Sequence, residues 1–120
     1  MPSGPSVRSV TDATFVDQVL LSDGPVLVDF WAAWCKPCRA MAPVIEQFAA
    51  AHQGRITVVK LDVDKNRESA ETYGITTVPT LKLFRGGREV ASIVGALPRK
   101  ALETRLREVL GRGPGTRSRS

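Results

Sequence analysis

The two cysteines of this chain, Cys35 and Cys38, are separated only by Lys36 and Pro37. This spacing allows one turn of helix to close a small disulfide and to reopen it. In a reducing cell, a single pair of this kind is more often a redox switch than a structural cross-link. The spacing therefore predicts reversible thiol–disulfide chemistry, in which a thiolate is the nucleophile.

The two sulfurs are expected to have different tasks. Cys35 stands where a buried strand over residues 26–31 leads into a helix, so unpaired backbone N–H groups and the helix dipole favour its thiolate. Cys38 lies one turn later on the apolar stripe of that helix, where we expect it to be shielded. We predict that Cys35 is the exposed thiol that attacks another protein's disulfide, and that Cys38 resolves the mixed disulfide.

Asp29 is the candidate base that takes the proton from Cys38. It stands inside the apolar run VLVDFW, which is typical of a central strand covered on both faces. Burial disfavours the ionised carboxylate and is expected to raise its pKa. Lys60, in the next predicted strand, is a candidate charged neighbour. The alternatives are a solvated strand-end carboxylate and an ordinary exposed lysine.

Lys36 and Pro37 are expected to tune the pair. Proline has a fixed φ and no N–H, so Pro37 stiffens the turn between the sulfurs. Lys36 brings a cation near Cys35, an effect of roughly 0.4 in pKa in a water-like dielectric. We therefore expect Lys36 to make the couple more oxidising, by tens of millivolts at most.

The elements that must position these residues alternate along the chain. In the first half of the chain we predict a short strand at 7–10, a helix at 12–21 with Thr11 as its N-cap, a strand at 26–31 and a helix that starts after Cys35. A strand at 55–61 and a helix at 66–73 that ends at Gly74 follow. The rest of the domain is predicted to be a hairpin of 80–84 with 89–94 across Gly86-Gly87, and a helix from Pro98 that Gly111 closes. This order implies an α/β domain with a mixed sheet and helices on both faces.

Composition sets the remaining bounds. With 42% apolar residues, 120 residues can bury a core without a structural disulfide. No apolar stretch suits a signal peptide or a membrane span, so we expect a soluble cytoplasmic protein. The net charge of the chain is +5, and three of the arginines that contribute to it lie in the last ten residues. We expect a domain over 1–110 and a disordered basic tail over 111–120, which solubilises the chain rather than binding nucleic acid.

Two short motifs resemble parts of metal sites, but a single chain does not supply the remaining ligands of either. Zinc prefers four ligands, and the only histidine, His52, lies at the far end of the helix after Cys35, where we expect a solvated side chain. A dimer that bridges zinc through two cysteine pairs stays open. The run from Asp62 to Asn66 resembles a calcium loop, but Arg67 replaces the required glycine. No phosphate-binding glycine loop is present, so a nicotinamide or flavin must belong to a partner.

Several separated motifs together resemble the thioredoxin family. They are residues 29–38 (DFWAAWCKPC), Pro43, Lys60, Val78-Pro79-Thr80, Gly86-Gly87 and Gly95. The resemblance spans about residues 7–110. It implies the thioredoxin fold, a central mixed sheet of four or five strands flanked by four helices, and it implies a protein-disulfide reductase with no bound cofactor.

The resemblance also implies roles for individual residues. Cys35 matches the attacking cysteine, Cys38 the resolving one, and Asp29 with Lys60 the buried base and its neighbour. The implied substrate groove consists of Trp34, Ile75, Thr77, Val78, Pro79, Gly95 and Ala96. Pro79 matches a cis-proline, which leaves the Val78 backbone free to pair with an extended substrate. Lys36 departs from the family, which usually has glycine there.

The implied partners are an NADPH-dependent thioredoxin reductase and disulfide-containing client proteins, with the chain acting as a monomer. Two other functions stay open. One is an oxidase or isomerase that uses the same sulfurs. The other is a binding module that uses the groove around Trp34 and Pro79 without turnover.

Overall fold

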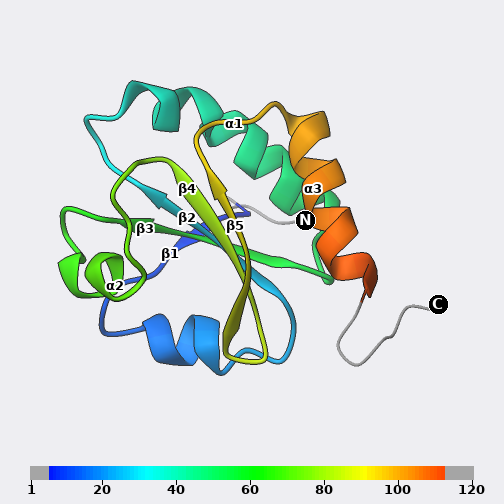
Figure 1. Ribbon diagram of the computed structural model, residues 1–120, viewed down its shortest axis with the longest axis horizontal. Coiled ribbons are helices and arrows are strands. Elements are labelled where there is room, and N and C mark those ends of the chain that lie inside the picture. Colours follow the sequence, from blue (N-terminus) through cyan, green and yellow to red (C-terminus); the bar gives the residue numbers. More distant parts are fainter. Residues whose placement is uncertain (1–5, 113–120) are drawn as a thin grey trace.

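The computed structural model describes residues 6–112, which form a five-stranded mixed sheet with helices on both faces (Figure 1). In chain order the elements are β1 (Arg8–Ser9), η1 (Val16–Leu20), β2 (Val26–Trp31), α1 (Lys36–Ala51), β3 (Thr57–Asp62), α2 (Arg67–Thr72), β4 (Thr80–Arg85), β5 (Arg88–Val94) and α3 (Arg99–Arg112). The strand order is β1-β3-β2-β4-β5. This architecture confirms the predicted fold class, including the short first strand.

β2 is the middle strand of the sheet, as its continuous apolar run predicts. It pairs in parallel with β3, where Asp29 lies opposite Lys60, and antiparallel with β4, where Asp29 lies opposite Leu81. Residues 26–30 are all buried. The carboxyl ends of β2 and β3 therefore meet at one edge of the sheet, and the segment with the two cysteines follows directly from that edge.

Two apolar cores lie on the two faces of the sheet, because successive side chains of a strand point to opposite faces. The core under α1 and α3 includes Leu27, Met41, Phe48, Leu81, Leu83, Leu102 and Leu106. The core under η1 and α2 includes Phe15, Val19, Val28, Phe30, Leu61 and Phe84. Asp29 has the same parity in β2 as Leu27, so its carboxylate lies on the α1 face of the sheet.

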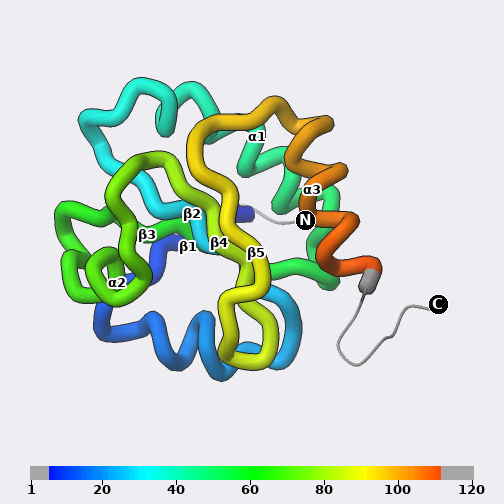
Figure 2. Tube along the Cα trace, viewed as in Figure 1, coloured from blue at the N-terminus to red at the C-terminus, as the bar shows by residue number. Residues whose placement is uncertain are grey.

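The β4–β5 hairpin turns at Gly86 and Gly87, as predicted. Their φ angles are 62° and 80°, the left-handed region that a tight hairpin turn of this kind requires at both positions. The turn lies beside the end of η1 (Figure 2), and a Cβ at position 87 would stand 3.3 Å from the carbonyl oxygen of Leu20. Glycine thus meets two constraints at position 87.

The first helical segment differs from the prediction. The predicted helix at 12–21 contains η1, in which Leu21 N–H donates to the carbonyl oxygen of Val16, five residues back, at 2.9 Å. Thr11 does not cap it with its side chain. Instead, Thr14 Oγ1 accepts a hydrogen bond from Thr11 N–H at 2.9 Å. The Thr14 side chain thus gives the Thr11 N–H group a hydrogen-bond partner, and this local bond takes the place of the expected cap.

The last helix also ends later than predicted. α3 continues through Gly111 to Arg112, so Gly111 does not close the helix. Its φ is not positive, and no heavy atom lies within 4 Å of a Cβ placed there. From residue 113 onward, the predicted tail lies outside the described residues. None of the helices within 6–112 is long and apolar enough to cross a membrane.

Candidate active site

Cys35 and Cys38 form a disulfide at the N-terminal end of α1, with their Cα atoms 5.3 Å apart. Cys35 is the N-cap residue of this helix, and its backbone is extended. Its Sγ accepts a hydrogen bond from Cys38 N–H at 3.1 Å. The sulfur therefore already faces one of the unpaired N–H groups of the first helical turn, and a thiolate formed there would gain from the same donor and from the helix dipole.

The expectation that Cys35 is the exposed sulfur is wrong for the disulfide state. The exposed fraction is 3% for Cys35 and 5% for Cys38, so both are buried. Cys35 Sγ lies 3.7 Å from the carbonyl oxygen of Val78, which belongs to a loop 43 residues further along the chain. With Ala32, the two cysteines form a small apolar cluster of their own against Val78. The two sulfurs differ in their neighbours rather than in exposure.

Cys38 opens onto a small cavity that also contains Asp29. The cavity has a volume of about 150 Å³ and is lined by Asp29, Trp31, Cys38, Arg39, Ala42 and Lys60. Ala42 lies one turn after Cys38 on α1, so the helix presents both residues to the cavity. A cavity of this size with several polar lining groups has room for water. The predicted base and the predicted resolving cysteine thus line the same cavity.

Asp29 has the electrostatics of a group that exchanges protons near neutral pH. Its exposed fraction is 8%, and no described residue gives its Oδ1 a hydrogen bond. Burial raises the pKa of Asp29 from 3.8 to about 7, and the charge of Lys60 opposes this rise. Lys60 Nζ lies 5.5 Å from the centre of the Trp31 ring, where a cation is favoured by the aromatic face.

Lys36 and Pro37 occupy the first turn of α1, between the two cysteines. Proline at this point suits the helix start, because its missing N–H would have no partner there. Both side chains are exposed. They are therefore placed to act on the Cys35 side of the disulfide without entering the core.

Four of the seven predicted groove residues line one shallow depression beside the cysteines. The depression has a volume of about 320 Å³ and is lined by Trp34, Val63, Ile75, Thr76, Thr77 and Val78. Trp34 is 68% exposed, which is unusual for so large an apolar side chain. A shallow apolar depression beside a disulfide is suited to contact with another protein.

The other three predicted groove residues lie next to this depression rather than in its lining. The Val78–Pro79 bond is cis, as the family resemblance implies. Pro79 is itself buried, and its carbonyl oxygen accepts a hydrogen bond from Gly95 N–H at 2.8 Å. This bond ties the residue after β5 to the loop before β4, and Ala96 follows as an exposed residue.

Two residues that were not predicted, Asp64 and Arg39, form hydrogen bonds at the site. Asp64 Oδ2 accepts a hydrogen bond from Trp34 Nε1 at 2.8 Å, and Arg39 Nη1 donates to the carbonyl oxygen of Ala33 at 2.8 Å. Asp64 comes shortly after the end of β3, and Trp34 comes shortly after the end of β2. Because these strands are parallel neighbours, their ends lie close together, and this arrangement could have indicated the pair. Arg39 is one turn after Cys35, and helical spacing could have indicated it.

The residues of the two discarded metal motifs have structural roles. His52 is not the solvated side chain that was expected. Its Nε2 lies 2.7 Å from Glu103 Oε1 of α3, and its ring packs 4.3 Å from the Phe48 ring. Asp62 Oδ1 accepts from Asp64 N–H at 2.9 Å, which shapes the loop after β3. Within residues 6–112, no three or more side chains from His, Cys, Asp and Glu are grouped so that they could hold a metal ion.

Comparison with known proteins decides the family. The sequence model of the thioredoxin family matches residues 6–108. The chain belongs to the thioredoxin family. It is 54% identical over 105 residues to a thioredoxin of Alicyclobacillus acidocaldarius, which covers 88% of this chain and 99% of that protein. It is 50% identical over 105 residues to thioredoxin 1 of a Nostoc species, covering 88% and 98%.

A third relative joins two proteins in one chain. It is the bifunctional thioredoxin reductase/thioredoxin of Mycobacterium leprae, 50% identical over 101 residues that make up 84% of this chain and 22% of the relative. Membership of the thioredoxin family, together with the Cys35–Cys38 disulfide at the start of α1, establishes the activity. The protein is a protein-disulfide oxidoreductase that works by dithiol–disulfide exchange through these two residues.

Proposed function

We propose that this protein reduces exposed disulfides of client proteins in the cytoplasm and is itself re-reduced by an NADPH-dependent thioredoxin reductase. The observation that carries the proposal is the hydrogen bond from Cys38 N–H to Cys35 Sγ at the start of α1. It supports Cys35 as the sulfur whose negative charge is stabilised, and hence as the nucleophile.

In the first step, the Cys35 thiolate attacks one sulfur of the client disulfide. A mixed disulfide forms between Cys35 and the client, the client's own S–S bond breaks, and its second sulfur leaves as a thiolate that takes a proton. Lys36, which is exposed beside Cys35, favours the anionic nucleophile weakly, because the interaction is screened by water and salt.

In the second step, Cys38 loses its proton and attacks Cys35 Sγ. The mixed disulfide breaks, the Cys35–Cys38 bond forms, and the client leaves with two thiols, having gained two electrons and two protons. Asp29 is the proposed base, because it lines the same cavity as Cys38 and has a pKa of about 7. The size of the cavity favours transfer through water rather than by direct contact. Lys60 keeps the pKa of Asp29 from rising further.

The client is proposed to bind over the depression beside Trp34, with its backbone extended along the Val78 loop and its flank on Gly95 and Ala96. Several features support this surface. Trp34 is exposed but held by its bond to Asp64, so ordering it on binding costs little entropy. The surface is apolar and shallow, which suits many unfolded or extended disulfide segments rather than one partner.

Two observations support the proposed electron donor and the proposed compartment. The Mycobacterium leprae relative is named as a reductase joined to a thioredoxin, which supports a reductase as the electron donor here. The only two cysteines of the chain are the redox pair, as suits a compartment in which structural disulfides are rare. We propose that the protein acts there as a monomer, with no bound cofactor.

Insulin reduction tests the proposal. In the presence of dithiothreitol, the wild type is expected to accelerate insulin precipitation, and Cys35→Ser is expected to abolish the acceleration. Cys38→Ser is the informative control, because it retains the nucleophile and should trap a mixed disulfide with insulin through Cys35. Client binding that survives Cys35→Ser, with a wild type that never reduces insulin, would instead favour a binding module.

The reduction potential separates a reductase from an oxidase. Equilibration with glutathione should give a value near the roughly −270 mV that characterises thioredoxins, and a value near −120 mV would identify a strong oxidant. The coupled oxidation of NADPH by a purified bacterial thioredoxin reductase tests the electron donor separately.

A further inference from the structure

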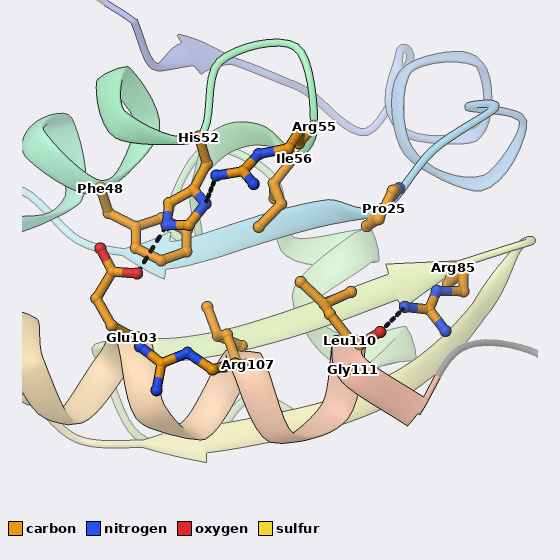
Figure 3. Close-up of a pocket in the computed structure, with 11 residues that line it drawn as sticks. Pro25, Phe48, His52, Arg55, Ile56, Arg85, Glu103, Arg107, Leu110 and Gly111 are labelled. Carbon is orange, nitrogen blue, oxygen red and sulfur yellow. Dashed lines mark hydrogen bonds and ion pairs between the residues drawn. The ribbon is translucent and has the colours of Figure 1, made fainter. Parts of the chain in front are cut away.

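A third pocket lies at the end of the sheet opposite the disulfide, and Figure 3 shows the residues that line it. Its volume is about 590 Å³, larger than the depression beside Trp34. Pro25, which immediately precedes β2, lines it, whereas Cys35 follows the other end of that strand. The two sites are thus separated by about 20 Å, the length of six strand residues. The thiol–disulfide chemistry makes no use of this pocket.

The walls of the pocket come from the ends of α1 and α3. Figure 3 shows His52, Arg55 and Ile56 on one side, with Glu103, Arg107 and Leu110 from α3 facing them across the gap. Its apolar lining consists of Pro25, Phe48, Ile56, Leu106 and Leu110. A volume of 300–1,000 Å³ with an apolar lining and a few polar groups is the usual form of a small-molecule site.

The polar groups of the pocket are mainly cationic. Three arginines line it, Arg55, Arg85 and Arg107, against a single carboxylate, Glu103. Glu103 already has partners, since Oε1 lies 2.7 Å from His52 Nε2 and Oε2 accepts from Arg99 at 3.4 Å. Although burial acts to raise the pKa of Glu103, its bonds to His52 and Arg99 hold it below the usual value, so this carboxylate stays ionised and paired.

Within residues 6–112, neither Arg55 nor Arg85 forms a salt bridge with a carboxylate. Arg55 Nη2 lies 3.3 Å from His52 Nδ1, and Arg85 Nη2 donates to the carbonyl oxygen of Leu110 at 3.4 Å. The partner of Arg55 is thus an imidazole nitrogen and the partner of Arg85 is a backbone carbonyl group, and neither is a carboxylate.

We propose that this pocket binds an amphipathic organic anion, with a compact aromatic or branched apolar body on Pro25, Ile56 and Leu110 and a carboxylate directed to the arginines. The charge of the rim favours an anion over a neutral or cationic ligand. The apolar floor disfavours a fully hydrated ion such as phosphate, which would leave that surface unused. Because the pocket is remote from Cys35, the bound ligand leaves the redox surface accessible.

A titration of the oxidised full-length protein with 2-naphthoate, followed by amide ¹H–¹⁵N spectra, tests the proposal. Naphthoate should shift the amide signals of His52, Ile56, Arg85 and Leu110, with a Kd of about 1 mM for a ligand of this size. Neutral 2-naphthylmethanol should bind about threefold to fivefold more weakly, since it lacks the charge. Inorganic phosphate, which lacks the apolar body, should give no saturable shifts at these positions at millimolar concentration.

Two arginines of α3 provide a matched pair of variants. Arg107 lines the pocket, and Arg105 is exposed on the same helix but does not line it. Arg107→Gln should weaken naphthoate binding about threefold to fivefold, the size of one partly exposed ion pair, and Arg105→Gln should not change it. Insulin reduction should be unaffected by bound naphthoate.

Several results would overturn the proposal. They are the absence of saturable shifts up to 10 mM naphthoate, equal binding of naphthoate and naphthylmethanol, equal effects of Arg107→Gln and Arg105→Gln, or shifts that centre on Trp34 and Val78 instead. The last result would assign the ligand to the client surface and leave the remote pocket without a function.

Discussion

At the scale of single residues, Asp29 is where function and stability oppose each other. A carboxylate in the middle of β2 is kept there at a cost, because its ionised form loses water and gains no hydrogen bond at Oδ1 from any described residue. The same burial brings its pKa to about 7, which is where a base for thiol chemistry is effective. The proposed role of Asp29 in deprotonating Cys38 would explain why this carboxylate is kept in the core.

The pH dependence of stability tests this view of Asp29. Its pKa is about 7 in the folded protein against 3.8 as the ordinary value. Well below pH 3.8 the carboxyl group is protonated in both the folded and the unfolded protein, so its burial costs no ionisation energy. As the pH rises from 3.8 to 7, only the unfolded protein ionises, so the stability present at low pH is progressively lost, and above 7 the folded protein must hold the ionised form. Asp29→Asn should therefore stabilise the oxidised protein at pH 8 by on the order of 4 kcal/mol and much less at pH 4.

Urea unfolding of wild type and Asp29→Asn at the two pH values measures this difference. The same variant should slow the release of the client from the mixed disulfide at pH 7, which a single-turnover assay with insulin reports. A stability gain that is equal at pH 4 and pH 8 would show that the effect comes from packing rather than from ionisation.

Lys36 gives a second prediction at this scale. Removing its charge in Lys36→Gly withdraws a weak stabilisation of the reduced, thiolate form of Cys35. The reduction potential should become more negative, by tens of millivolts at most, because both the side chain and the charge are exposed to solvent. Equilibration with glutathione at low salt measures it. An unchanged or less negative potential would count against this role for Lys36.

The residues that could be predicted from the sequence were those whose environment depends on local pattern. Asp29 stands in an apolar run and Cys38 on an apolar helix stripe, so their burial follows from their neighbours along the chain. The burial of Cys35 depends on Val78, and the role of His52 depends on Glu103. Those contacts join segments more than 40 residues apart, and nothing in the local pattern reports them.

At the scale of elements, the start of α1 is the feature that is proposed to activate the Cys35 sulfur. A buried strand ends at Trp31 and the helix begins at Lys36, so the chain must turn with Cys35 at the N-cap. Strand bounds were predicted to within about two residues, because β2, β3 and the hairpin combine apolar runs with glycine turns. The first helix was less predictable, since the pair of Thr11 and Thr14 replaces the expected cap.

The hairpin turn gives a prediction for stability. Gly87→Ala forces a side chain into a left-handed backbone and places a Cβ 3.3 Å from the carbonyl oxygen of Leu20, so it should destabilise the protein by about 1–2 kcal/mol. Gly111→Ala is the matched control, because Gly111 is helical with open space around it. It should stabilise α3 by up to about 1 kcal/mol. Thermal unfolding of both variants compares them, and equal effects would contradict this assignment of the two backbones.

At the scale of the whole molecule, the fold separates two chemistries along the sheet. One end holds the disulfide, the Asp29 cavity and the depression beside Trp34, and the other end holds the arginine-lined pocket between α1 and α3. The mixed sheet could be predicted from the order of the elements. The arginine-lined pocket could not, because it depends on how the ends of two helices distant in sequence pack together.

The proposed mechanism requires Cys35 to be the sulfur that ionises near neutral pH in the reduced protein. The rate of iodoacetamide alkylation, measured from pH 5 to 10 with the modified peptide identified by mass spectrometry, tests this. We predict selective modification of Cys35 with a midpoint near pH 7, a value typical of thioredoxins. A midpoint near 8.5, the value of an ordinary cysteine, or modification of Cys38 first would contradict the account.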